Sequence, residues 1–281
     1  MTHTSAIRFI LTGTLVSTSL MLYSCGSDSG PREGTPAFYW AGAKEAFAAR
    51  DYVKTSENLA RITATENEYT ARARTWQLAL TSGIARGYQD LADSFEAGAR
   101  ANKNNPAAFR RSTHNYRVEA SRYALEFVEA YDKFQKSKDD PVPLAFPFPT
   151  GSAAPVVELT KASAGMVLAQ GELEPAEKRV LSRGVLLGAC NAVGATDDPP
   201  KAQELLKSGN LQVPRTAFVT AMANALFDAG QLYNTRKIDN PDKYKIFCDR
   251  ALDALKSVPE TKETKELTKK ITASLKKTDR Y

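Results

Sequence analysis

The sequence has 281 residues, of which 42% are hydrophobic, and a formal net charge of +6. This length is ample for a large core, either in one elongated body or in two domains. The basic excess is mild, 38 Lys and Arg residues against 32 Asp and Glu residues, and it does not indicate nucleic-acid binding.

The N-terminal stretch is typical of a secretory signal. Arg8 is followed by an uncharged run from Phe9 to Tyr23. This run is shorter than the roughly 20 apolar residues of a membrane-spanning helix, but long enough for the apolar core of a signal peptide. We therefore expect export of the chain.

The end of this run resembles the lipobox of bacterial lipoproteins, which consists of Leu, a variable residue, a small residue and Cys. Leu22, Ser24 and Cys25 match the pattern, and Tyr23 is the variable residue. The resemblance implies that Cys25 becomes the first residue of the mature chain and is lipidated, which gives stable anchoring. Gly26 follows the cysteine instead of Asp, which in this family favours the outer membrane.

Apolar residues recur from Pro36 onward at spacings of three and four, which predicts an all-α protein. We expect a first helix from Pro36, capped by Thr35, and a second helix after the break at Arg50 and Asp51. The hairpin resembles a tetratricopeptide repeat, a helix-turn-helix of about 34 residues. Arg50 stands where this family usually has glycine. The resemblance implies a solenoid of helical hairpins.

The next segment predicts a second hairpin, with helices at about 68–86 and 88–101 and a turn at Gly87-Tyr88 that repeats the first one. After a break at 102–106, the pattern predicts one long helix from Pro106 to about Lys136.

Five prolines between Pro141 and Pro155 predict an extended segment. Its apolar side chains favour a strap packed over the helices rather than a docking segment for a partner, and it is the best candidate for a domain boundary. Helices are expected after it at about 155–170, 175–194, 199–208, 214–234, 242–259 and 260–277. The predicted organisation is a signal peptide, a flexible tether, N-terminal hairpins, a Pro-rich linker and C-terminal repeats that end in a Lys-rich capping helix, at residues 1–24, 25–35, 36–140, 141–155 and 156–281, respectively.

Cys190 and Cys248 are the cysteines other than Cys25. In an oxidising periplasm they could form a disulfide, which would stabilise the fold by about 4 kcal/mol. The alternative is two buried thiols, each packed as a small hydrophobic side chain.

Enzyme motifs are scarce, and we expect neither catalysis nor a cofactor. Apart from His3 in the signal, the chain has one histidine, His114, so a multi-histidine zinc site cannot form. Phosphate-binding loops, dinucleotide-binding glycines and the Gly-x-Ser-x-Gly motif are missing from the sequence. Ser274 and Lys277 fit a Ser-x-x-Lys pattern, but they belong to a Lys-rich helix where nothing would desolvate the lysine.

Two basic segments are candidate binding surfaces. In the first, arginines alternate with aromatic residues, and guanidinium groups bind carboxylates in a bidentate fork. Its candidate partner-binding residues are Arg110, Arg111, Tyr116, Arg117 and Arg122, and a solvated helix face is the alternative. The second is the Lys-rich final helix, which could contact an anionic lipid or wall polymer.

Together these features predict a lipid-anchored scaffold that faces the periplasm and holds other envelope proteins. At the level of fold, this resembles outer-membrane lipoproteins with tetratricopeptide repeats. The alternative is a lipoprotein that binds a small ligand or an anionic cell-wall polymer. Nucleic acid is not an expected partner.

Overall fold

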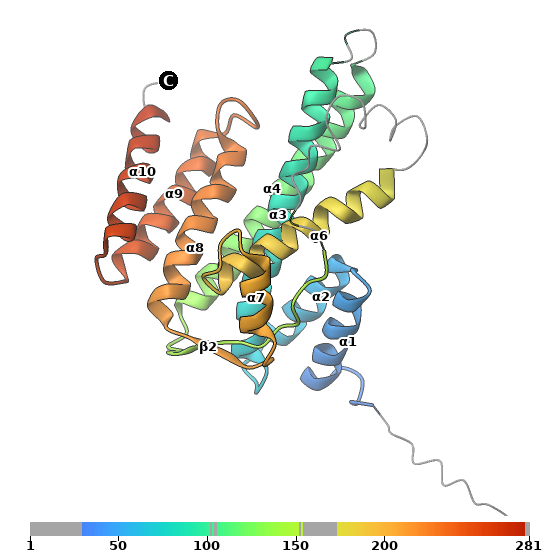
Figure 1. The fold of residues 1–281 in the computed structure, drawn as a ribbon, viewed down its shortest axis with the longest axis vertical. Helices are drawn as coiled ribbons and strands as arrows, with labels where there is room; N and C mark the ends of the chain where they lie inside the picture. Colours follow the sequence, from blue (N-terminus) through green and yellow to red (C-terminus); the bar gives the residue numbers. More distant parts are fainter. Residues whose placement is uncertain (1–29, 102, 104–105, 152, 154–172, 279–281) are drawn as a thin grey trace, which may run out of the picture. The chain divides into compact units, whose positions relative to one another are not determined.

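The computed structural model describes residues 30–278, apart from residues 102, 104–105, 152 and 154–172. The described secondary structure is almost entirely helical, which confirms the all-α prediction (Figure 1). The elements in chain order are α1 (Pro36–Ala48), α2 (Tyr52–Thr63), α3 (Thr70–Ala101), α4 (Ala107–Gln135), β1 (Val142–Leu144), α6 (Leu173–Ala192), α7 (Pro199–Leu206), β2 (Leu211–Val213), α8 (Arg215–Gly230), the short 3-10 helix η2 (Gln231–Tyr233), α9 (Pro241–Lys256) and α10 (Lys262–Thr278).

The first hairpin forms where the sequence predicts it. The Thr35 hydroxyl accepts a hydrogen bond from the Phe38 amide at 3.3 Å, and the Asp51 carboxylate accepts one from the Lys54 amide at 3.0 Å. These bonds satisfy amide groups that have no partner within the helix at the starts of α1 and α2. Arg50 lies between the helices with a φ of 61°, in the left-handed region where glycine costs least.

The predicted turn at Gly87-Tyr88 is wrong, because α3 runs without a break from Thr70 to Ala101. A glycine inside a helix costs only about 1 kcal/mol relative to alanine, which packing can offset. Gly87 lies against Val180 and Leu181 of α6, and the Tyr88 ring stacks on Tyr123 of α4 with the ring centroids 5.8 Å apart. These tertiary contacts require a continuous helix at this point.

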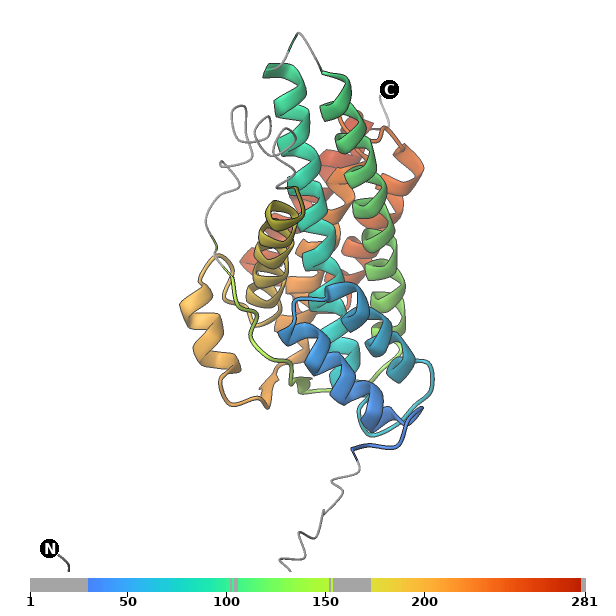
Figure 2. The ribbon, with the colours of Figure 1, turned by 90° about the vertical axis from the view of Figure 1, so that its right-hand side faces the viewer.

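Helix α3 is the central element of the described fold. It packs against α4 on one side and α6 on another, as Figure 2 shows, and it also contacts α2, α8 and β1. The crossing with α6 is unusually close, because Gly83 and Gly87 of α3 face Gly184 and Gly188 of α6. A methyl group added at Gly83 would lie 2.7 Å from the Val185 Cα.

The Pro-rich segment packs over the helices as a strap. Val142, Leu144 and Phe146 are buried, and β1 pairs antiparallel with β2. The Thr75 hydroxyl of α3 also donates a hydrogen bond to the Pro143 carbonyl at 2.7 Å. Alternate residues of β1 are buried, and the hydrogen bond from the Thr75 hydroxyl ties the segment to α3. These contacts fix the position of a segment that the sequence predicts only as extended.

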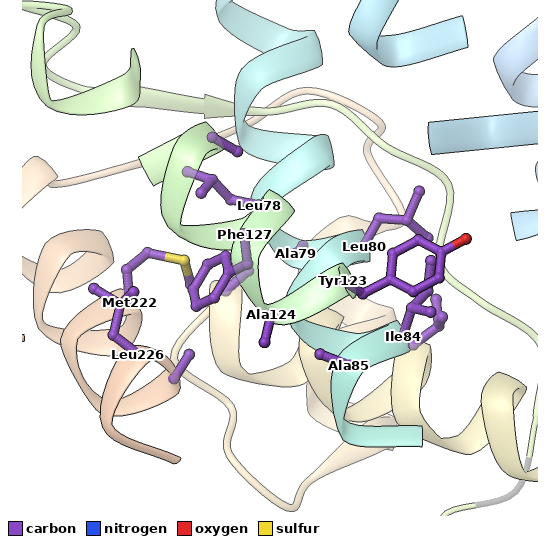
Figure 3. Packing of buried hydrophobic residues seen from close by; sticks show 14 of the residues in the cluster. Leu78, Ala79, Leu80, Ile84, Ala85, Tyr123, Ala124, Phe127, Met222 and Leu226 are labelled. Atoms are coloured by element: carbon purple, nitrogen blue, oxygen red, sulfur yellow. The ribbon is translucent and has the colours of Figure 1, made fainter. Parts of the chain in front are cut away.

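The helices before and after the strap share one core, so the strap does not separate two compact units as the sequence analysis expected. Contacts divide the chain at Gly30, and residues 31–281 form a single unit. Figure 3 shows Phe127 of α4 beside Met222 and Leu226 of α8, near Leu78 of α3. Burying these side chains requires both halves at once.

The C-terminal part forms a second hairpin of α8 and α9, as expected. Asn240 caps α9 by accepting a hydrogen bond from the Lys243 amide at 2.9 Å. Helix α10 packs on α9, buries Ile271 and leaves its lysines exposed. The predicted signal peptide, Cys25, most of the tether and the helix at 155–170 lie outside the described residues.

Candidate functional site

A hollow of about 690 Å³ opens where α3 ends and α4 begins. We call it the basic pocket. It is lined by Glu96, Ala99 and Arg100 of α3, by Arg110, Thr113, His114, Arg117, Val118 and Ser121 of α4, and by Lys237 and Ile238 of the loop after η2. The spacings of three and four along α3 and α4 place these side chains on one face of each helix.

Two of the basic side chains in the pocket are neutralised. Arg117 forms an ion pair with Glu96 at 2.8 Å, and Lys237 forms one with Asp93 at 2.7 Å. Both cations are largely buried, whereas Asp93 and Glu96 are partly exposed. These pairs join α4 and the η2 loop to the end of α3, and they hold the walls of the pocket in place.

Arg100 and Arg110 differ from this pair of cations. Both are exposed, and no ion pair between described residues involves either of them. Beside them are the apolar side chains of Val118, which is 52% exposed, and Ile238. The pocket thus combines two available guanidinium groups with an apolar wall, an arrangement that can bind a carboxylate or phosphate with an apolar neighbour.

The structure brings Arg110 and Arg117 to the pocket, but not the other predicted binding residues. Arg111 is exposed outside it. Arg122 lies over the Tyr123 ring, 4.2 Å from its centroid, and forms an ion pair with Glu119 at 2.7 Å. Tyr116 is buried against Tyr88 and Phe95, and burial raises the pKa of its hydroxyl. Tyr116 therefore contributes to packing between α3 and α4, whereas the contacts of Arg122 lie within α4.

Sequence reasoning missed Lys237 and Ile238 as pocket residues. They belong to the insertion between α8 and α9, far along the chain from α4. An insertion that interrupts a helical hairpin is a signal for a functional loop, but it does not say which surface the loop meets.

Other kinds of site are not evident in the described part of the chain. No group of three or more His, Cys, Asp or Glu side chains is placed to hold a metal ion among residues 30–278 as described. Within the same residues, every helix is too short or too polar to cross a bilayer.

Cys190 and Cys248 are both free and buried, with no disulfide between them. Burial raises the pKa of each thiol to about 11. Since the thiolate is the reactive form, a rise from 9 to 11 lowers its population about a hundredfold.

We therefore expect both thiols to react with a thiol reagent much more slowly in the folded protein than a free cysteine does. Both should react once unreduced protein, produced without Cys25, is unfolded in denaturant. A count of two thiols per chain would agree with this structure. A count of zero would show that the disulfide forms instead.

No protein-family model matches the chain, and neither the curated proteins nor the solved structures include one with detectable similarity.

Proposed function

We propose that the protein is a lipid-anchored binding protein of the outer membrane, facing the periplasm, which holds another envelope protein by an acidic segment bound in the basic pocket. The lipobox residues Leu22, Ser24 and Cys25 support the anchor. The hairpins α1–α2 and α8–α9 support a repeat-like scaffold, in which helices present a binding surface without a catalytic centre.

The observation that carries this proposal is the pair of exposed arginines at the mouth of the pocket. Arg100 comes from the last turn of α3, and Arg110 comes from the first turns of α4. Guanidinium groups that are not already paired can form bidentate bonds to Asp or Glu side chains. Val118 and Ile238 can contact apolar residues next to those acids. An acidic segment with apolar residues fits both features.

The size of the pocket also favours a second candidate function. A volume of about 690 Å³ lies in the range of small-molecule sites, roughly 300–1,000 Å³. A small anionic ligand, or one unit of an anionic wall polymer, could occupy the same arginines. This alternative uses the same residues and differs in the identity of the bound molecule.

The experiment is purification of the anchored protein from crosslinked, detergent-solubilised envelopes. Wild type is compared with the double variant Arg100→Ala/Arg110→Ala. A matched control is Arg61→Ala/Arg111→Ala, which removes two exposed arginines that do not line the pocket. Each charged hydrogen bond contributes about 1.5–3 kcal/mol, so the pocket variant should lose a captured protein by at least about tenfold.

The control should retain that protein at the level of wild type. Equal loss from both variants would show that general charge, and not the pocket, recruits the partner. Capture of no protein by wild type, together with a small anion that only wild type retains, would overturn the protein-binding function in favour of the ligand-binding one.

A further inference from the structure

A second hollow lies near the other end of α3. Its volume is about 790 Å³, and we call it the aromatic-basic groove. Helix α1, α3, the strap and α7 together form its walls. The lining residues are Trp40, Lys44, Arg72, Ala145, Phe146, Pro147, Phe148, Pro200, Gln203, Glu204, Leu206, Lys207 and Gly209.

The groove combines aromatic rings with positive charge. The Arg72 guanidinium lies 5.8 Å from the centroid of the Trp40 ring and 5.5 Å from that of Tyr69. Lys44 and Lys207 are exposed at the edges, against one acidic lining residue, Glu204. In the described residues, no ion pair involves any of these three cations. The groove therefore carries a positive excess.

An exposed aromatic side chain lies at the start of α1, outside the groove lining. Phe38, in the first turn of the helix, is 39% exposed and contacts Tyr39 edge to face. Trp40, which lines the groove, is two residues further on, so the two side chains lie on different faces of α1. Aromatic side chains with lysines and arginines beside them are characteristic of surfaces that meet the interface of a bilayer.

The distance along the chain from Cys25 keeps this end of the body near the membrane. The start of α1 at Pro36 is eleven steps along the chain from Cys25, with ten residues between them. A Gly- and Ser-rich tether of this length has a typical end-to-end distance of about 18 Å and cannot extend beyond about 40 Å. If Cys25 carries lipid, α1 is the helix held closest to the bilayer by the chain.

We propose that the aromatic-basic groove is the membrane-facing surface of the protein, and that it binds the head groups of anionic phospholipids in the leaflet that holds the lipidated Cys25. This inference rests on the lipid anchor of the proposed function. The lysines attract the phosphates, and Phe38 contacts the apolar edge of the interface.

The two hollows then have different tasks at opposite ends of one helix. Arg72 lines the groove and Arg100 lines the basic pocket, 28 residues apart on α3. At 1.5 Å per residue, this separation is about 42 Å along the helix axis. Binding of the groove to lipid leaves the basic pocket free for a partner.

The test uses residues 26–281, which contain the whole compact unit and its core but lack the lipidated cysteine. Sedimentation with vesicles of phosphatidylcholine alone is compared with vesicles that also contain phosphatidylglycerol. We expect binding to the anionic vesicles only, weakened by salt. Since each basic side chain near an anionic surface changes binding about fivefold, Lys44→Gln/Lys207→Gln should weaken it about 25-fold.

The matched control is Lys262→Gln/Lys269→Gln, which removes the same charge from exposed positions of α10. It should bind as wild type does, whereas Phe38→Ser should weaken binding without a change of charge. Equal weakening by the α10 control, or no binding of wild type to anionic vesicles, would overturn the proposal. Because no lipid is attached in this assay, its failure is distinct from failure of the anchor, which membrane retention of a Cys25→Ser variant measures in cells.

Discussion

Gly184→Ala is expected to destabilise the protein by about 3 kcal/mol, the upper end of the usual cost of overpacking. The added methyl group would lie 2.7 Å from the Gly87 amide nitrogen and 2.8 Å from its Cα, and closer still to the Gly83 carbonyl oxygen. These are backbone atoms of a long helix, so no side chain can rotate away. The two helices would have to move apart along their crossing.

Urea unfolding of wild type and variant measures this loss as a difference in the free energy of unfolding. Gly42→Ala is the matched control, because a methyl group there meets only the flexible Asn58 side chain, at 3.2 Å from its amide nitrogen. Better helix propensity should leave that variant unchanged or stabilise it by up to about 1 kcal/mol. Equal midpoints for the two variants would show that α3 and α6 do not cross this closely.

This crossing also shows why part of the fold was not predictable. Gly83 and Gly87, like Gly184 and Gly188, are four residues apart and so share one helix face. In the sequence alone, a glycine within a helical pattern is one signal of a helix end. This signal is the reason for the predicted turn at Gly87. Gly87 is a packing residue because it contacts α6, which lies about a hundred residues further along the chain. Local periodicity contains no information about this contact.

Local signals, by contrast, predicted well. Helix starts are marked by Thr35 with Pro36 and by Asp51, through bonds within four residues, and α1 and α2 begin there in the structure. The regular stacking of a tetratricopeptide solenoid is not established by this fold. Helices α3 and α4, with 32 and 29 residues, are each about twice the length of a repeat helix.

The candidate site was predictable in the same partial way. Arg110 and Arg117 belong to one helix, and their spacing of seven residues places them on the same face. Tyr116 and Arg122 are close to them in sequence, but they lie at angles that turn them toward α3 and toward Glu119. Glu96 of α3 forms an ion pair with Arg117 of α4, so Arg117 is not available to bind a partner. This contact joins two helices, and the sequence of α4 alone does not predict it.

Leu144→Ala is expected to lower the free energy of unfolding by about 2–5 kcal/mol, the cost of a large-to-small change in a core. Leu144 is fully buried in β1, opposite Leu211 of β2, within a segment whose prolines would suit a simple linker. Thr150→Ala is the matched control in the same segment, since Thr150 is exposed and should change stability by less than about 0.5 kcal/mol.

Urea unfolding of the two variants decides between a structural strap and a linker. If the strap closes the core that α3 shares with the C-terminal helices, Leu144→Ala should shift one cooperative transition of the whole unit to lower urea. A Leu144→Ala variant as stable as Thr150→Ala, or an unfolding curve with separate transitions for the two halves, would contradict this and restore a domain boundary at residues 141–155. Phe146 of the strap lines the groove, whereas Val142 and Leu144 of the strap are buried in the core. Loss of the strap should therefore uncouple the end of α3 that borders the groove from the C-terminal helices.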